Sequence, residues 1–182
     1  ADFVRVQARA RPDAPALWFE GRETSFAALD SASSQCAQAL LAAGAAPGDR
    51  IGVLAKNTDA FLTLWFGAMK ARACTVPVNT RLAPPEIVAI LRDSGATHLV
   101  FGDDFAGLAD TIAGGCPSLT TLLQFEPGHR SVPGFGDWIA AHPATDPHLA
   151  EQADDDIIQL YTSGTTGLPK GVPLTHAKAL AQ

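Results

Sequence analysis

Residues 161–172 read Tyr161-Thr162-Ser163-Gly164-Thr165-Thr166-Gly167-Leu168-Pro169-Lys170-Gly171-Val172, and this stretch decides how the sequence folds and what it can bind. Thr162 to Gly167 is an unbroken run of hydroxyl-bearing residues and glycines, and Lys170 follows three positions later. Glycine lets the backbone approach a ligand closely, and consecutive backbone N–H groups form a donor surface that suits an anion. A lysine adds a compact positive charge. The stretch therefore predicts a loop that wraps a phosphate chain.

The order of these residues differs from that of a P-loop, in which a lysine directly follows the second glycine and a helix begins. Here Pro169 precedes Lys170, and the proline restrains the turn and lacks an N–H. The flanking segments, residues 157–161 and 171–174, are typical of strands. We therefore predict a strand–loop–strand hairpin. A plain surface turn is the alternative interpretation, because Gly, Ser and Thr are common in turns.

Strand and helix patterns alternate along the rest of the chain. Short apolar runs predict strands over residues 50–54, 74–78, 97–101 and 119–125, and a small hairpin over 16–24. Helical spacing of apolar residues predicts helices over residues 3–10, 25–43, 57–72, 85–94, 105–113 and 138–141. Ser25 and either Asn57 or Thr58 are expected N-caps, and Gly95 a helix stop. This alternation predicts an α/β fold with a largely parallel sheet flanked by helices, which ends in the β-hairpin of the phosphate loop.

Composition limits the classes of function. The 182 residues are 47% apolar, which fits a compact globular protein, and the net charge of −6 argues against a general nucleic-acid binder. The longest strongly apolar segment, residues 60–69, is too short to span a bilayer, and no signal peptide is visible. We expect a soluble, cytoplasmic protein. Its three cysteines, Cys36, Cys74 and Cys116, are scattered, so we expect buried free thiols and no zinc site.

The region from Pro127 to Asp156 is rich in Pro, Gly, His and acidic residues. We interpret it as a surface connector that leads into the strand before the loop. Asp154, Asp155 and Asp156 are consecutive, and three consecutive carboxylates on an extended chain cannot all face one ion. We therefore expect a solvated acidic turn rather than a metal site, and surface charges at Lys56 and Arg81.

Asp156 to His176 resembles the signature loop of the adenylate-forming superfamily, which includes acyl-CoA synthetases, peptide-synthetase adenylation domains and beetle-luciferase-like enzymes. Pro77-Val78-Asn79-Thr80-Arg81-Leu82 is similar to the acyl-CoA synthetase branch, although physically it is a strand end followed by a polar turn. Thr175-His176 matches the family's Thr-His pair, and we expect a capping or packing role there. Arg72 departs from the pattern, since the family often has glycine at this place.

The resemblance implies an AMP-forming ligase, which joins a carboxylic acid to ATP with release of pyrophosphate and passes the acyl group to coenzyme A. It implies fatty acid metabolism as the setting and ATP, Mg²⁺ and coenzyme A as the cofactors. Thr162 would also ligate the metal, and the substrate carboxylate itself would be the nucleophile, so no catalytic residue is expected in this chain. The implied nucleotide-binding residues are Thr162, Ser163, Gly164, Thr165, Thr166, Gly167 and Lys170.

Members of this superfamily are considerably longer. We therefore expect residues 1–182 to be the N-terminal segment of the large AMP-binding domain, inactive alone, with the rest of that domain and a C-terminal lid domain absent. A peptide-synthetase-type adenylation domain and a non-catalytic nucleotide- or phosphate-binding module are the alternatives. The expected partners are a small carboxylic acid, ATP and coenzyme A, and a homodimer is left open.

Overall fold

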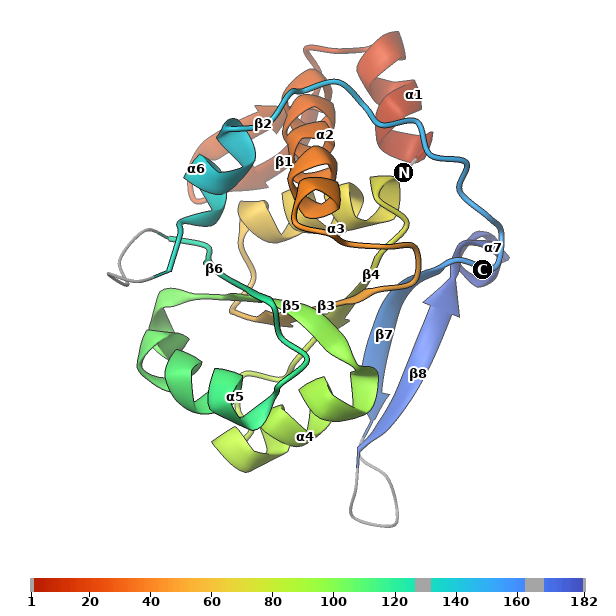
Figure 1. Ribbon diagram of the computed structural model, residues 1–182. Coiled ribbons are helices and arrows are strands. Elements are labelled where there is room, and N and C mark those ends of the chain that lie inside the picture. Colours follow the sequence, from red (N-terminus) through yellow and green to blue (C-terminus); the bar gives the residue numbers. More distant parts are fainter. Residues whose placement is uncertain (1, 127–131, 163–168, 182) are drawn as a thin grey trace.

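The computed structural model shows strands and helices alternating along the chain, as the sequence predicted (Figure 1). It describes residues 2–126, 132–162 and 169–181. The strands are β1 (Pro15–Phe19), β2 (Arg22–Ser25), β3 (Arg50–Leu54), β4 (Cys74–Pro77), β5 (Ala96–Phe101), β6 (Thr121–Gln124), β7 (Asp156–Thr162) and β8 (Lys170–Thr175). The helices are α1 (Asp2–Ala10), α2 (Phe26–Ala42), α3 (Asp59–Lys70), α4 (Pro84–Ser94), the 3₁₀ helix η1 (Asp103–Leu108), α5 (Ala109–Gly115), α6 (Phe135–Ala140) and α7 (His176–Leu180).

A six-stranded sheet with the order β6-β5-β3-β4-β7-β8 forms the centre of the fold. The pairs from β6 to β7 are parallel, and β8 runs antiparallel to β7. Strands β1 and β2 form a separate antiparallel hairpin. The predicted α/β class, the largely parallel sheet and the two hairpins are confirmed.

Helices cover both faces of the sheet, with α2 and α3 on one side and α4 and α5 on the other (Figure 1). Strand β3 shows why two layers of helices are needed, because its side chains alternate between the faces. Ile51 and Val53 pack with the cluster that includes Leu40 of α2 and Leu64 of α3. Leu54 packs with the opposite cluster, which holds the apolar side chains of α4 and α5. The central strands therefore lie between two apolar cores.

The helix ends follow local signals in the sequence. Ser25 is the N-cap of α2, since its Oγ accepts a hydrogen bond of 3.2 Å from the backbone N–H of Ala28. Thr58 rather than Asn57 caps α3. Gly95 ends α4 with a φ of 67°, a conformation that suits glycine. These boundaries confirm the predicted caps.

Helix α6 begins at Phe135, three residues earlier than the predicted start at Trp138. Phe135 is almost completely buried, and its ring packs edge-on against Phe125 with the centroids 5.4 Å apart. The first turn of α6 is therefore anchored by a contact with the segment that follows β6, which local periodicity did not reveal.

The connector between α6 and β7, residues 141–155, crosses α2 and passes α1 before it enters β7 (Figure 1). Two glutamines of α2 hold its backbone. Gln35 donates to the carbonyl of His142 at 3.1 Å, and Gln38 donates to the carbonyl of Thr145 at 2.8 Å. The connector is therefore fastened to the helical layer along its length.

Asp146 of the connector lies at the centre of a partly buried ionic cluster. Arg5 of α1 hydrogen-bonds both of its carboxylate oxygens, at 2.7 and 3.0 Å. The ammonium of Lys70, whose side chain is completely buried, lies 3.4 Å away and donates to Asp30 and Ser34 of α2. Burial alone would raise the pKa of Asp146, but these cations and hydrogen bonds hold it well below its usual range.

The expectation of a solvated acidic turn is wrong for Asp155 and Asp156. Asp155 accepts two hydrogen bonds of 2.8 Å from the guanidinium of Arg72. Asp156 accepts one of 2.6 Å from Arg50 of β3. The sequence pattern missed these pairs because each arginine lies more than 80 residues earlier, 83 for Arg72 and 106 for Arg50.

Other predictions also have an outcome in this fold. Cys36, Cys74 and Cys116 are buried and free, as expected. In the described part of the chain, no helix is long and apolar enough to cross a membrane. His176 is the first residue of α7, whose N-cap is Thr175, and its Nε2 lies 3.5 Å from Glu151, which fits the expected packing role.

Candidate functional site

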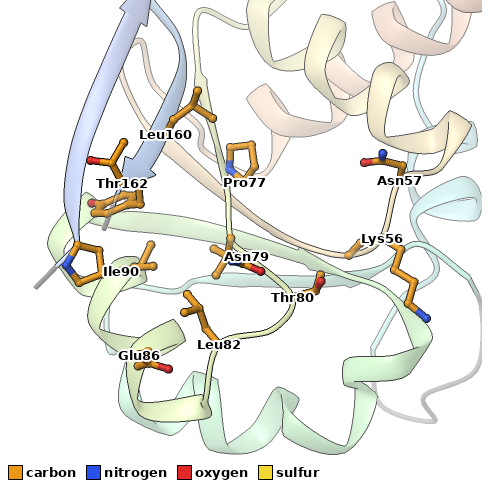
Figure 2. Close-up of a pocket in the computed structure, with 14 residues that line it drawn as sticks. Lys56, Asn57, Pro77, Asn79, Thr80, Leu82, Glu86, Ile90, Leu160 and Thr162 are labelled. Atoms are coloured by element: carbon orange, nitrogen blue, oxygen red, sulfur yellow. The ribbon is translucent and has the colours of Figure 1, made fainter. Parts of the chain in front are cut away.

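The chain leaves the carboxyl ends of β3 and β4 in opposite directions. After β3 it continues into α3 on one face of the sheet, and after β4 it continues into α4 on the other (Figure 1). Parallel sheets bind ligands in the crevice that such a divergence opens. A cavity of about 750 Å³ lies at this place (Figure 2).

Within the described residues, four parts of the chain line this cavity. They are the segment after β3 (Ala55, Lys56 and Asn57), the end of β4 with the segment after it (Pro77, Val78, Asn79, Thr80 and Leu82), helix α4 (Glu86 and Ile90) and the hairpin (Leu160, Tyr161, Thr162 and Pro169). Figure 2 shows Leu160 and Thr162 on one side, Lys56 and Asn57 on the other, and Asn79 between them. The cavity therefore joins the crevice of the parallel sheet to the base of the predicted phosphate loop.

Thr162 and Lys170 are direct register partners in the β7–β8 hairpin, one at the end of each strand. Both side chains are exposed, and Thr162 lies at the edge of the cavity. An exposed hydroxyl and an exposed ammonium group thus flank the predicted loop, a pair that suits an anion. Ser163, Gly164, Thr165, Thr166 and Gly167, the other predicted ligands, lie outside the described residues.

The segment after β4 forms part of the site, whereas the sequence predicted only a strand end and a polar turn there. Its predicted conformation is confirmed, since Asn79 accepts a hydrogen bond of 3.0 Å from the N–H of Arg81 in a polar turn, and Arg81 is exposed. Asn79 and Thr80 nevertheless line the cavity. The signal that could have found them is the position of polar residues directly after a parallel strand.

Tyr161 lines the same cavity from the hairpin and is held by α4. Its hydroxyl donates a hydrogen bond of 2.6 Å to the carboxylate of Asp93. Burial and this hydrogen bond raise the pKa of Tyr161 to about 12, so the hydroxyl keeps its proton at neutral pH.

The charged side chains that line the cavity, Lys56 and Glu86, are already engaged with other groups. Lys56 is a surface charge, as predicted, and is paired with Asp104 at 2.6 Å, which raises its pKa. Glu86 is already engaged as a cap, since it accepts a hydrogen bond of 2.8 Å from the N–H of Ala83. Within the described ranges no three His, Cys, Asp or Glu side chains are grouped to hold a metal ion. These residues therefore do not fit a magnesium site by themselves.

The chain is similar to known enzymes over nearly its whole length. A family model described as AMP-binding enzyme matches residues 4–182. The chain is 39% identical over 175 residues to the fatty acid–[acyl-carrier-protein] ligase ScoC of Streptomyces coeruleorubidus, which covers 96% of this chain and 32% of that ligase. It is 36% identical over 152 residues to the long-chain-fatty-acid–CoA ligase FadD13 of Mycobacterium tuberculosis, with 84% of this chain and 29% of that ligase covered.

Among solved structures, the anthranilate CoA ligase AuaEII in complex with anthranoyl-AMP superposes with a TM-score of 0.90. It is 32% identical, and the match covers 96% of this chain and 34% of that one. The chain thus spans about a third of the length of the curated relatives and of this ligase.

Proposed function

The chain belongs to the family of AMP-binding enzymes, and we propose that the protein activates a carboxylic acid with ATP, forming an acyl-adenylate and pyrophosphate, and then transfers the acyl group to coenzyme A. In the first step an oxygen of the carboxylate bonds to the α-phosphorus while the bond to the departing pyrophosphate breaks. In the second, the thiol sulfur bonds to the acyl carbon while the bond from that carbon to AMP breaks, and the thiol proton is released to water.

The register of Thr162 with Lys170 is the observation that carries this proposal. It sets one hydroxyl and one ammonium group on the two sides of the loop, and Thr162 lines the cavity at the carboxyl ends of the parallel strands. These two groups would hold the departing phosphates, whose negative charge grows as the bond breaks. The resemblance adds Ser163, Gly164, Thr165, Thr166 and Gly167 to the same role.

Magnesium belongs to the proposal only through the resemblance, which assigns Thr162 as a ligand. When bound, the ion would neutralise phosphate charge. Because the described residues around the cavity do not form a cage of carboxylates, its other ligands would be phosphate oxygens, water or residues outside the described ranges.

We also propose that residues 1–182 form the N-terminal part of a larger nucleotide-binding domain and are inactive alone. The support is the share of the relatives that the chain spans, about a third. The adenine and acyl pockets would then come from chain outside this segment. Acid-dependent exchange of pyrophosphate into ATP by the 182-residue chain itself would contradict this part of the proposal.

A carrier protein is a second candidate for the acyl acceptor. One relative, 39% identical, is named as a fatty acid–[acyl-carrier-protein] ligase. The two acceptors share the adenylation step and differ only in the second. Incubation of the full-length protein with acid and ATP, followed by coenzyme A or a phosphopantetheinylated carrier protein, distinguishes them by which thioester forms.

The adenylation step is tested by ATP–pyrophosphate exchange in the full-length protein. Exchange that requires a carboxylic acid is expected. Lys170→Ala should lower it at least tenfold, because a phosphate loses its cation. Lys178→Ala is the matched control, since Lys178 is an exposed lysine of α7 outside the cavity lining, and should change nothing. ATP binding without any acid-dependent exchange would instead favour a nucleotide-binding module.

A further inference from the structure

A chain of hydrogen-bonded side chains runs along β7 and ends at the base of the loop. Tyr161 donates to Asp93, so its hydroxyl oxygen can accept, and Gln159 donates to that oxygen from Nε2 at 3.0 Å. The side-chain amide oxygen of Gln159, Oε1, accepts in turn from Nε of Arg50 at 3.0 Å. Because a carboxylate can only accept and a guanidinium can only donate, the direction of every hydrogen bond in this chain is fixed.

Gly171 makes room for this arrangement. It is the register partner of Tyr161 on β8. A Cβ atom at residue 171 would lie 2.5 Å from Nε2 of Gln159 and 3.1 Å from both Cζ and the hydroxyl of Tyr161. The side chain of Tyr161 therefore lies across the backbone of β8 at the residue that follows Lys170. The packing of Tyr161 is therefore a sufficient reason for glycine at residue 171, and no contact of Gly171 with a phosphate is required.

Helix α4 contacts the hairpin on both sides of the loop. Ala89, Ile90 and Asp93 border a small cavity together with Tyr161, which precedes the loop, and Pro169, which follows it. Ile90 is almost completely buried there. One face of α4 thus supports both strands of the hairpin at the level of the loop.

The backbone alone provides little support at this level. Among the described residues, the register between β4 and β7 consists of the single pair Thr75 and Ile158. The last residues of β7 extend beyond that pair and are joined in register only to β8, the edge strand. The hydrogen bond from Tyr161 to Asp93 therefore ties the free end of the hairpin to the rest of the fold.

We propose that Tyr161 is a positioning residue for phosphate binding: its hydroxyl, held by Asp93, sets where Thr162 and Lys170 meet the departing phosphates of ATP. This inference rests on the proposed function. In this role Tyr161 does not contact the α-phosphorus or the attacking carboxylate. It acts through Thr162, the next residue in sequence, and through Lys170, which precedes its register partner Gly171 on β8.

The test uses the full-length protein with MgATP and its carboxylic acid in the exchange assay. Tyr161→Phe removes one oxygen and keeps the ring, and Asp93→Ala removes the acceptor. We expect each to raise KM for ATP or lower kcat about tenfold, since a hydrogen bond to a charged group is lost, and to leave KM for the acid unchanged. Asp110→Ala, on the exposed surface of α5, is the matched control for removal of a helix carboxylate and should be neutral.

The double variant Tyr161→Phe with Asp93→Ala should be no worse than either single variant, because both remove the same hydrogen bond. Gly171→Ala gives an independent check, as its Cβ displaces the side chains of Gln159 and Tyr161 and should produce the same rise in KM for ATP.

A purely structural tyrosine would behave differently. The variants would then lower the unfolding temperature while both KM values and kcat stayed at the wild-type level, or their effects would add in the double variant. Either result overturns the inference. Absence of acid-dependent exchange in the wild-type protein would instead contradict the proposed function, so the two failures are distinguishable.

Discussion

Arg72 has a φ of 59° and binds both carboxylate oxygens of Asp155, each at 2.8 Å. A residue in this left-handed region is under steric strain unless it is glycine, and the superfamily that this chain resembles often has glycine here. The hydrogen bonds from Arg72 lower the pKa of Asp155, and those same bonds raise the pKa of Arg72. The side chain of Arg72 thus links the end of α3 to the residue before β7, although the backbone of Arg72 is strained.

Substitutions at residue 72 separate these two effects. Arg72→Ala loses the contacts to Asp155 and keeps the left-handed strain, whereas Arg72→Gly loses the contacts and relieves the strain. We therefore expect the glycine variant to be more stable than the alanine variant by about 1 kcal/mol. Urea unfolding of the two variants measures this difference. Equal midpoints would show that the backbone at residue 72 carries no strain.

Lys70 should be essential for stability because its ammonium is completely buried between α2, α3 and the connector. Lys70→Met keeps most of the side-chain volume and leaves the carboxylates of Asp30 and Asp146 without their common cation. Breaking a buried ion pair from one side costs about 3 kcal/mol. Lys178→Met on the exposed side of α7 is the control. A loss below about 1 kcal/mol, typical of exposed pairs, would contradict this assignment.

Gly67 sets the distance between α2 and α3. A Cβ at this position would lie 2.6 Å from both Cβ and Sγ of Cys36 and 3.0 Å from the carbonyl of Ser33. Gly67→Ala should therefore destabilise the protein by about 1–3 kcal/mol through overpacking. Gly114→Ala on α5, where a Cβ would meet nothing within 4 Å, is the control. Cys36→Ala in the Gly67→Ala background removes the sulfur and should restore part of the lost stability.

His98 should make stability depend on pH. Its ring is buried, its Nε2 has no hydrogen-bond partner among the described residues, and burial lowers its pKa. The unfolded chain then binds a proton near the ordinary pKa of about 6.5, while the folded chain resists protonation. The free energy of unfolding should therefore be greatest above that pH and fall as the pH drops below it.

His98→Phe isolates this contribution, because it removes the titrating ring and the buried Nε2 while keeping an aromatic side chain. Urea unfolding between pH 5 and 7.5, the range around the ordinary histidine pKa, should show a shallower pH dependence than in the wild type. Some dependence should persist, since burial also lowers the pKa of His176. Parallel curves for the two proteins would contradict the assignment.

The sequence predicted best those features that depend on neighbouring residues. The cap at Ser25 and the stop at Gly95 act within one helical turn, so their residue types were enough, whereas for α3 they left Asn57 and Thr58 as alternatives. The alternation of strands and helices likewise predicted the class of fold, and the segments around Lys170 predicted a hairpin.

Long-range contacts explain what local patterns missed. The sequence predicted the connector but not its attachment to α1 and α2, because Arg5 and Gln38 lie 141 and 107 residues earlier in the chain than their partners. The place of Asn79 in the cavity depends on β7 lying beside β4, a pairing with a single register contact. Asp155 was predicted to be solvated because its partner, Arg72, follows α3 and lies 83 residues earlier in the chain.

The connector's ion pairs also impose an order on the assembly of this fold. Arg5 pairs with Asp146 and Glu151, which lie 141 and 146 residues later in the chain. Contacts between residues so far apart in sequence form slowly, because a long loop must close before the contacts can stabilise the fold. Helix α1 is synthesised early, yet its carboxylate partners on the connector leave the ribosome only near the end of this segment. The ion pairs between α1 and the connector are therefore among the last contacts of this segment to form, and α1 stays without these carboxylate partners until then.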